Sequence, residues 1–235
     1  MSVPTGKLRA APRPVVLVTS GAYSPVHRNH LLYMEAARAF LEAPIPAAVR
    51  GPAASGPGAP VEVVGGYVSP LPDRMVARRR GGAIPRPHRV AMLQLATSAS
   101  PWLMVVDADL HGTALFRAAA VAAVEALGRP VTVVAVCGAD GYRASDRFLP
   151  TRIPLACVRR TGEDAEWKRL WKQTASARRV YLVEDNHQPQ RRSATQIRAW
   201  LHRAEHDEQA RAQLRLHLHP DVLRYLLDHP ETYAS

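Results

Sequence analysis

The sequence predicts an α/β fold of the Rossmann-like kind, with a mostly parallel sheet, helices on both faces and a small helical C-terminal part. Short apolar runs alternate with helical patterns along most of the chain, which is typical of strand–helix–strand units. Of the 235 residues, 47% are hydrophobic, which is enough to bury a core of domain size. Because such sheets bind ligands beyond the carboxyl ends of their strands, functional residues are expected just after strands.

Six apolar runs are expected to form the strands. The first, at residues 15–18, has the length and the continuous Val and Leu content of a buried parallel strand. The other five runs lie at residues 61–64, 102–106, 131–136, 155–158 and 180–183. Helical spacing of apolar residues predicts helices at residues 27–42, 88–97, 113–127, 164–173 and 194–203.

A single domain over residues 15–235 is the simplest division, because no repeat and no second composition regime divides the chain. Residues 1–14, which end in Ala-Pro-Arg-Pro, are expected to form a flexible basic arm. Residues 43–60 are rich in Ala, Pro and Gly, and are expected to form a flexible surface loop.

The composition excludes several classes of protein. The formal net charge is +11, and all but three of the 31 basic residues are arginine, which suits phosphate contacts but also follows from GC-rich codons. Cys137 and Cys157 lie in apolar runs and cannot build a disulfide framework. No run reaches the length of a membrane span, and the first fourteen residues lack the apolar region of a signal peptide. We therefore expect a soluble cytoplasmic protein without a membrane partner.

The first candidate site is the turn Gly21-Ala22-Tyr23-Ser24-Pro25, which lies between the first strand and the first helix. A glycine here lets backbone N–H groups approach a phosphate, and the start of the helix adds a partial positive charge. His27 and His30 are three residues apart and share a helix face, so both imidazoles could donate hydrogen bonds to phosphate oxygens. The alternative is a helix start with two incidental surface histidines.

The second candidate segment is residues 190–198, between the last expected strand and a helix. Ser193 is expected to be the N-cap of that helix, while Thr195 and Arg198 share one of its faces. Hydroxyls, a helix N-terminus and guanidinium groups together suit a polyphosphate. The alternative is a capping serine beside solvated arginines. Both candidate segments should open on one edge of the same sheet, which favours the functional interpretation.

Three other patterns give weaker evidence about function. His202 and His206 are four residues apart, a spacing that can bind zinc, but a third ligand is not evident and a solvated helix surface is expected. Trp167 and Trp171 are expected to anchor a helix in the core. The sequence contains neither the P-loop pattern GxxxxGK[ST] nor GxGxxG.

Taken in order along the chain, these segments resemble the motifs of the nicotinamide/nicotinate mononucleotide adenylyltransferases of the eukaryotic type, in the HxGH nucleotidyltransferase superfamily. Residues 21–30 resemble the opening GSFNPxTxxH or GSFxPxHxxH segment, and residues 192–198 resemble the closing ISSTxxR signature. The segments that match between them are Gly66-Tyr67-Val68-Ser69-Pro70-Leu71, Asp73 with Arg78, Arg79 and Arg80, His88-Arg89-Val90-Ala91-Met92, Ser100-Pro101-Trp102 and Cys137-Gly138-Ala139-Asp140. The resemblance covers nearly the whole chain.

The resemblance implies transfer of AMP from ATP to the phosphate of nicotinamide or nicotinate mononucleotide, giving an NAD-type dinucleotide and pyrophosphate. It also implies Mg²⁺, bound mainly through substrate phosphates, with no metal ligand assigned in the protein. The expected catalytic residues are His30, His27 and Arg198. The expected nucleotide-binding residues are Gly21, Ala22, Tyr23, Gly138, Asp140, Ser193 and Thr195. The expected acceptor-binding residues are Tyr67, Ser69, Trp102, Arg78 and Arg79.

Departures from the family pattern concern mainly the acceptor. The family carries a second Trp that stacks on the pyridine ring, but residues 141–153 contain no Trp, and residues 105–109 lack the family's Trp and Glu. Ala22 and Ala194 replace family serines, and Gln196 replaces a common Lys. A second hypothesis is therefore nucleotidyl transfer, from ATP or CTP, to a different phosphorylated acceptor in specialised metabolism.

A third hypothesis, from another class, is a non-catalytic nucleotide- or RNA-binding module. The charge of +11 and the altered motifs favour it. Both histidines and Arg198 are nevertheless present, and no RNP-like aromatic and basic signature is visible, which argues against nucleic acid as a partner. The sequence leaves the oligomeric state open, including a homo-oligomer.

Overall fold

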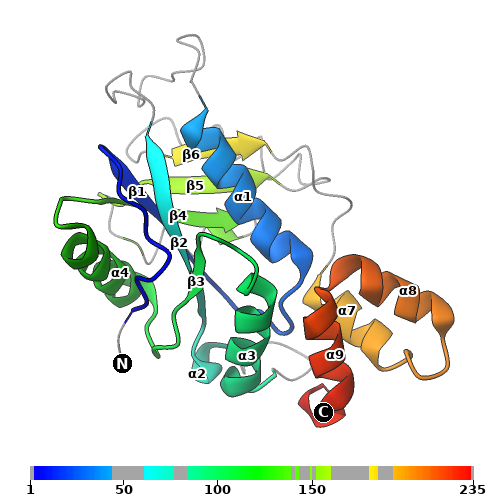
Figure 1. The fold of residues 1–235 in the computed structure, drawn as a ribbon. Helices are drawn as coiled ribbons and strands as arrows, with labels where there is room; N and C mark the ends of the chain where they lie inside the picture. Colours follow the sequence, from blue (N-terminus) through cyan, green and yellow to red (C-terminus); the bar gives the residue numbers. More distant parts are fainter. Residues whose placement is uncertain are drawn as a thin grey trace.

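The computed structural model of the chain describes residues 3–43, 61–76, 84–138, 141–142, 149, 152–159, 180–184 and 193–233. These residues build a six-stranded sheet in the order β3-β2-β1-β4-β5-β6, in which all neighbouring strands pair in parallel (Figure 1). The strands are β1 Pro14–Gly21, β2 Glu62–Pro70, β3 Leu103–Val105, β4 Thr132–Gly138, β5 Leu155–Arg159 and β6 Val180–Glu184. The six predicted strands and the Rossmann-like α/β class are confirmed.

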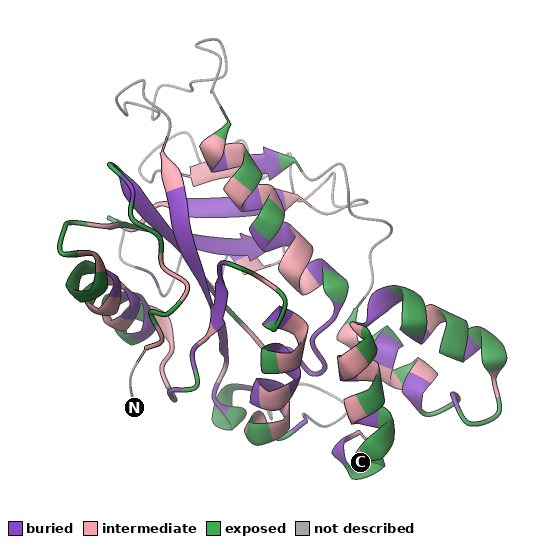
Figure 2. Ribbon diagram, viewed as in Figure 1, coloured by how far each residue is buried: buried purple, intermediate pink, exposed green. Residues whose placement is uncertain are grey.

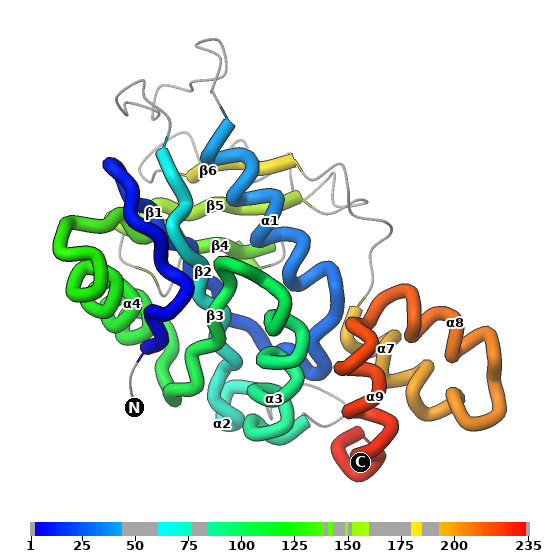
Figure 3. Tube along the Cα trace, in the orientation of Figure 1, coloured from blue at the N-terminus to red at the C-terminus, as the bar shows by residue number. Residues whose placement is uncertain are grey.

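The helices follow the sheet strands in alternation and then gather at the C-terminal end. They are α1 Arg28–Glu42, α2 Asp73–Val76, α3 Arg86–Thr97, α4 Gly112–Leu127, α7 Ala194–Leu201, α8 Glu208–His217, α9 Pro220–Asp228 and the short 3-10 helix η3 Pro230–Thr232. Four predicted helices appear with shifts of a few residues at their ends. The fifth, at residues 164–173 with Trp167 and Trp171, lies outside the described residues. Helices α7, α8 and α9 form a small group beside the start of α1 and beside α3 (Figure 3).

The sheet separates two hydrophobic cores, and its strands other than the edge strand β6 are buried along most of their length (Figure 2). One face packs against α1, α3 and the C-terminal helices, while the other face packs against α4. In β1, Leu17 belongs to the first core, and Val16 and Val18 belong to the second. Because helices cover both faces, the central strands are continuous apolar runs without polar alternation. No helix of the described residues is long and apolar enough to cross a membrane.

The direction of strand order reverses at the centre of the sheet. From β1 the chain continues to β2 and β3 on one side, whereas β4, β5 and β6 lie on the other side. The carboxyl ends of the neighbouring strands β1 and β4 are Gly21 and Gly138. Doubly wound sheets bind their ligands in the crevice at such a switch point. The fold therefore places the turn after β1 where a ligand site is expected.

Residues 3–13 are packed against the domain, which corrects the expectation of a flexible arm. The Nζ atom of Lys7 donates to the carbonyls of Thr97 (3.1 Å) and Ser100 (2.7 Å), at the end of α3. The backbone N–H of Arg9 donates to β2, and Ala11 is only 4% exposed. The sequence did not predict these contacts, because the partners of Lys7 lie 90 and 93 residues further along the chain. Of the predicted loop at residues 43–60, all but the first residue lies outside the described residues.

Candidate active site

The side chain of Tyr23 is buried in the core next to the turn after β1. Its side chain is 1% exposed, and its φ of 47° lies in the left-handed region that residues other than glycine rarely adopt. An added Cβ at Gly21 would lie 3.0 Å from the Tyr23 ring, so a glycine suits this position. The Tyr23 hydroxyl shares a hydrogen bond with Tyr33 (3.3 Å), which in turn bonds to Thr19 (2.9 Å).

This buried placement corrects part of the nucleotide-binding expectation for Tyr23. Burial raises the pKa of the Tyr23 hydroxyl well above its ordinary value, and the neighbouring Tyr33 raises it further. The phenol is therefore neutral and enclosed in the core. Because this side chain is buried, a phosphate could contact only the backbone of Tyr23 and the half-buried residues Gly21 and Ala22 in this part of the turn.

His27 and His30 stand at the start of α1, as predicted, but their environments differ. His27 is the N-cap residue and is 4% exposed, whereas His30 is half-buried. Their ring centroids are 3.7 Å apart, and the His30 ring also meets the Tyr23 ring edge-on at 5.0 Å. The backbone N–H of His27 donates to Nδ1 of His30 at 3.1 Å. An accepting Nδ1 belongs to the neutral tautomer that carries its proton on Nε2, so Nε2 is the donating nitrogen of His30.

The second predicted segment meets the turn at this same edge. Ser193 is the N-cap of α7, because its hydroxyl accepts from the backbone N–H of Gln196 at 3.3 Å, while the Gln196 side chain accepts from the backbone N–H of Ser193 at 3.0 Å. Thr195 is exposed beside it. From the same helix, Nη1 of Arg198 donates to the carbonyl of Ser24 at 2.6 Å. Burial lowers the pKa of the Arg198 guanidinium.

The contact between Arg198 and Ser24 joins residues 174 positions apart in the sequence. It confirms that the two candidate segments open on one edge of the sheet. The start of α1 and the start of α7 both lie at this edge (Figure 1). Two helix N-termini, the imidazole of the half-buried His30 and one guanidinium therefore lie close together, a combination that suits a polyphosphate. The His27 side chain is 4% exposed, which corrects the expectation that its imidazole also contacts phosphate.

Arg89 of α3 lies beneath this edge and was assigned no role from the sequence. Its side chain is 0% exposed. The guanidinium donates to the carbonyls of Ala22 (2.8 Å), Leu71 (2.7 Å) and Ile84 (2.8 Å), and to the carboxylate of Asp73 (2.6 Å).

A signal for Arg89 was present in the sequence. Arg89 precedes Met92 and Leu93 by three and four residues, so it shares their helix face, and both are 0% exposed. An arginine on a core-facing stripe is almost never buried without partners. Its acceptors could not be identified from the sequence, because three of the four, Ala22, Leu71 and Asp73, precede Arg89 by 16 to 67 residues.

Trp102 lies in the hydrophobic core, which corrects the expectation that its indole stacks on an acceptor. The side chain is 2% exposed and precedes β3, at the opposite end of the strand from the turn edge. Its Nε1 donates to the carboxylate of Glu35 at 2.8 Å, and the Arg38 guanidinium lies 5.0 Å from the ring centroid. An added Cβ at Gly66 would lie 2.5 Å from the indole, so the backbone of β2 packs directly against the ring.

Tyr67 and Ser69 are enclosed within β2, which corrects the expectation that their side chains contact the acceptor directly. Both are 0% exposed, and neither hydroxyl has a hydrogen-bond partner in the described structure. Desolvation raises the pKa of Tyr67 to about 12. Unpaired buried hydroxyls reduce stability. Ser69 pairs with Ser20 of β1, directly beneath the turn, whereas Tyr67 lies deeper, in the core against α4.

Gly138 ends β4, the strand that pairs with β1. Asp140 lies outside the described residues. The same is true of the predicted acceptor arginines, Arg78 and Arg79. Among the residues that are described, no group of three or more His, Cys, Asp or Glu side chains could hold a metal ion.

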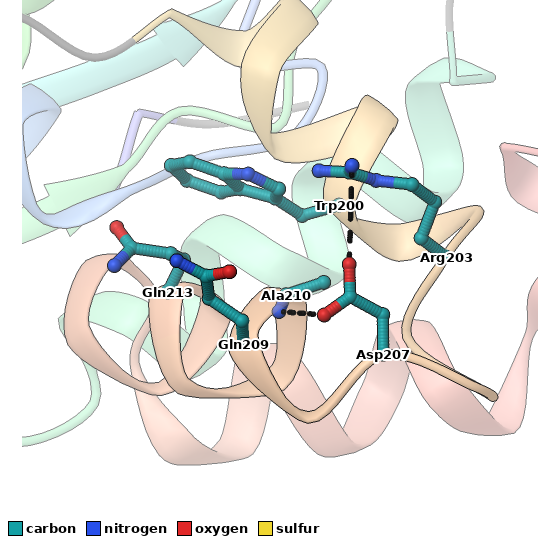
Figure 4. A pocket seen from close by; sticks show the side chains of 6 residues that line it. All are labelled: Trp200, Arg203, Asp207, Gln209, Ala210 and Gln213. Carbon is teal, nitrogen blue, oxygen red and sulfur yellow. Dashed lines mark hydrogen bonds and ion pairs between the residues drawn. The ribbon is translucent and has the colours of Figure 1, made fainter.

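A pocket lies between α7 and α8, and none of the turn residues lines it (Figure 4). Asp207 caps α8 by accepting from the N–H of Ala210 at 2.9 Å, and it forms an ion pair with Arg203 at 3.8 Å. The lining residues are Trp200, Arg203, Asp207, Gln209, Ala210 and Gln213. This pocket is therefore a feature of the C-terminal helices and not of the candidate site.

Comparison with known proteins gives one match in sequence. No protein-family model matches the chain. Nicotinamide/nicotinic acid mononucleotide adenylyltransferase 2 of Danio rerio is 30% identical over 91 residues, which is 39% of this chain and 24% of that protein. The match thus spans about a quarter of the relative's length. Over those 91 residues the chain is similar to a protein of the family that its motifs resemble.

Solved structures give matches in fold. Plasmodium falciparum nicotinic acid mononucleotide adenylyltransferase complexed with NaAD has a TM-score of 0.56 at 12% identity, over 94% of this chain and 98% of that chain. The same protein complexed with APC has a TM-score of 0.54 at 11% identity, over 93% and 96% of the two chains. At such identities the likeness shows the fold, and it confirms the predicted architecture over nearly the whole chain.

Proposed function

We propose that this chain, which resembles the nicotinamide/nicotinate mononucleotide adenylyltransferases, transfers AMP from ATP to the phosphate of nicotinamide or nicotinate mononucleotide. The products are an NAD-type dinucleotide and pyrophosphate. One observation carries the proposal: the 2.6 Å hydrogen bond from Arg198 to Ser24 holds helix α7 against the turn that leads to His27 and His30. The names of the relatives in sequence and fold support the choice of acceptor.

The reaction needs no general base. A phosphate monoester has a second pKa of about 6, so its oxygens are largely ionised at neutral pH. One acceptor oxygen forms a bond to the α-phosphorus of ATP while the bond from that phosphorus to the bridging oxygen breaks. The electron pair of the broken bond leaves with pyrophosphate. The protein therefore contributes alignment and stabilisation of charge.

The turn after β1 would hold the α and β phosphates. Backbone groups of Gly21 and Ala22 lie there, and α1 directs its positive N-terminal end to the same place. His30 would donate from Nε2 to an oxygen on which negative charge grows as the bond breaks. His27 is the buried N-cap, so its part is to orient His30 through its backbone N–H.

The start of α7 would hold the β and γ phosphates and the departing pyrophosphate. Ser193, Thr195 and Arg198 present a capped helix N-terminus, an exposed hydroxyl and a guanidinium there. A Mg²⁺ ion of this kind would be held mainly by oxygens of the substrate phosphates and would need few protein ligands. When bound, that ion neutralises part of the phosphate charge.

A second candidate keeps the chemistry and changes the acceptor. The burial of Trp102 favours it, because the indole expected to form an aromatic wall is enclosed in the core. Residues 141–153 supply no other Trp. On this alternative, the same turn transfers a nucleotidyl group from ATP or CTP to a different phosphorylated small molecule.

Product analysis tests both candidates. The purified chain is incubated with Mg²⁺, with ATP or CTP, and with nicotinamide mononucleotide, nicotinate mononucleotide or a panel of sugar and alcohol phosphates. A dinucleotide formed with either pyridine mononucleotide supports the first candidate, and a product formed only with another acceptor supports the second. Absence of any product, together with salt-sensitive RNA binding that persists in His30→Ala, would favour the non-catalytic module instead.

A further inference from the structure

We infer that Arg89 is a positioning residue for adenylyl transfer, which holds the turn after β1 and the segment after β2 in one fixed arrangement. The inference rests on the proposed function. It deepens that proposal by naming a residue that shapes the phosphate-binding turn without contacting substrate. Arg89 lies in the segment of residues 88–92 that resembles a family motif, but no role follows for it from that resemblance.

Every acceptor of the Arg89 guanidinium belongs to a segment at the carboxyl edge of the sheet. Ala22 lies in the turn after β1, while Leu71 and Asp73 follow β2. Ile84 lies just before α3, so its bond anchors the guanidinium to the start of its own helix. A rigid planar fork that donates to several acceptors at once fixes their positions relative to one another. One side chain thus ties three segments together.

Two further hydrogen bonds connect the same segments. The backbone N–H of Leu71 donates to the carbonyl of Gly21 at 2.9 Å. The backbone N–H of Ile84 donates to the Ser24 hydroxyl oxygen at 2.9 Å. The Ser24 carbonyl is held by Arg198. The turn is therefore clamped from beneath by the Arg89 network and from the side by α7.

The bond to Ala22 has a consequence for phosphate binding. The peptide between Ala22 and Tyr23 is trans, so its C=O and N–H point in opposite directions. Because the Ala22 carbonyl is directed at the buried guanidinium, the Tyr23 N–H is directed away from it. Without Arg89, this peptide plane could rotate, and the backbone donors of the turn would lose their fixed direction. Preorganised donors of this kind stabilise developing charge.

The test compares Arg89 variants with matched variants of Arg86. Arg86 lies on the same helix and also donates to a carboxylate and a carbonyl, those of Asp107 and Ala108, both at 2.9 Å. The hydrogen bonds that the structure gives for its side chain go to the segment after β3 and not to the turn after β1. The variants are Arg89→Lys, Arg89→Met, Arg86→Lys and Arg86→Met. For each, kcat, the KM for ATP and the melting temperature are measured.

We expect Arg89→Met to lower kcat about 100-fold, since a displacement of about 1 Å in a positioning element has this effect. Arg89→Lys should recover part of the loss, because an ammonium retains the charge and some of the donors. The Arg86 variants should keep a kcat within about twofold of wild type. Equal losses of kcat from the Arg89 and Arg86 variants would overturn the inference.

A double variant separates positioning from loss of stability. If Arg89 acts through the turn that aligns phosphate with His30, then Arg89→Met should cost much less in a His30→Ala background than in wild type. Two independent effects would instead multiply, and that result would overturn the inference.

The inference remains testable if Arg89→Met does not fold. Asp73 is 55% exposed, so Asp73→Asn is expected to fold while it weakens the charged end of the network. We expect a loss of kcat of about threefold to tenfold in Asp73→Asn, and a larger loss in Arg89→Lys. Wild-type kcat in both folded variants would overturn the inference alone. An inactive wild-type chain would overturn the proposed function, and the inference with it.

Discussion

The backbone N–H of His27 donates to Nδ1 of His30 across 3.1 Å at the first turn of α1. This bond selects the tautomer in which Nε2 of His30 carries the proton. It also explains why two histidines three residues apart have different parts. The buried one caps the helix and orients the other, which is half-buried at the turn.

His30→Ala should lower kcat about 100- to 1,000-fold and change the KM for ATP much less, because it removes one preorganised donor to the developing charge. His30→Asn provides a sharper variant, since its side-chain oxygen can still accept from the His27 N–H while the Nε2 donor is lost. Steady-state rates and thermal melts of both variants provide the measurement. The matched control is His206→Ala, because the His206 side chain is 87% exposed. A folded His30→Ala chain that keeps more than about a tenth of wild-type kcat would contradict the role.

Arg198→Ala should lower kcat about 10- to 100-fold, because a hydrogen bond to or from a charged group contributes about 1.5 to 3 kcal/mol. The substitution removes both the clamp on Ser24 and the cation beside the leaving pyrophosphate. Arg192→Ala should have a smaller effect, because Arg192 precedes the cap of α7 in the sequence. The measurement is kcat of the Arg198→Ala and Arg192→Ala variants under identical conditions. Equal losses of a few fold would indicate general basic charge and not a placed guanidinium.

Trp102→Phe should lower the free energy of unfolding by about 1 to 3 kcal/mol and leave the KM values of both substrates unchanged. The indole is enclosed in the core and donates to Glu35, so its loss affects packing and one hydrogen bond. Urea unfolding and steady-state kinetics on the same preparation give both quantities. If the variant were as stable as wild type and had a raised acceptor KM, Trp102 would have to contact the acceptor after all.

Tyr67→Phe should leave stability unchanged or slightly higher at pH 7, because it removes an unpaired buried hydroxyl. In alkali the two proteins should differ. Burial raises the pKa of Tyr67 from 10.0 to about 12, so between these values the unfolded chain has lost a proton that the folded chain still holds. The contribution of Tyr67 to stability is therefore intact below pH 10, and it falls by about 1.4 kcal/mol per pH unit between pH 10 and about 12.

Urea unfolding of wild type and Tyr67→Phe at pH values from 9 to 11.5 measures this difference. Wild type should lose stability more steeply than the variant once the pH passes about 10. Parallel curves would show that the Tyr67 hydroxyl titrates equally in the folded and unfolded chain.

The sequence predicts the sheet and the turn well because both depend on local pattern. Continuous apolar runs locate all six strands, and the turn followed by His27 and His30 is placed correctly at the end of the first strand. The end of β2 is less well predicted, since that strand continues through Gly65 and Gly66 to Pro70. Glycines normally weaken a strand, but here their missing side chains leave room for Leu8 and Trp102.

The features that the sequence did not predict depend on contacts between residues that are distant in sequence. The side chain of Arg89 binds residues in two earlier loops, and Lys7 binds the end of a helix 90 residues later. Burial of Trp102 likewise follows from its placement before β3 and beneath Gly66. No local pattern gives these distances. Family motifs identified the segments that meet at the site, but not which of their side chains face the core.

The central claim is adenylyl transfer at the turn after β1, and the fate of the α-phosphate of ATP tests it most directly. Wild-type chain is incubated with Mg²⁺, nicotinamide mononucleotide and ATP labelled at either the α or the γ phosphorus, beside His30→Asn as the matched control. The account predicts that the α label enters a dinucleotide, that the γ label leaves as pyrophosphate, and that His30→Asn slows both. Transfer of the γ label to the acceptor, or release of the α label as free AMP without a dinucleotide, would contradict it.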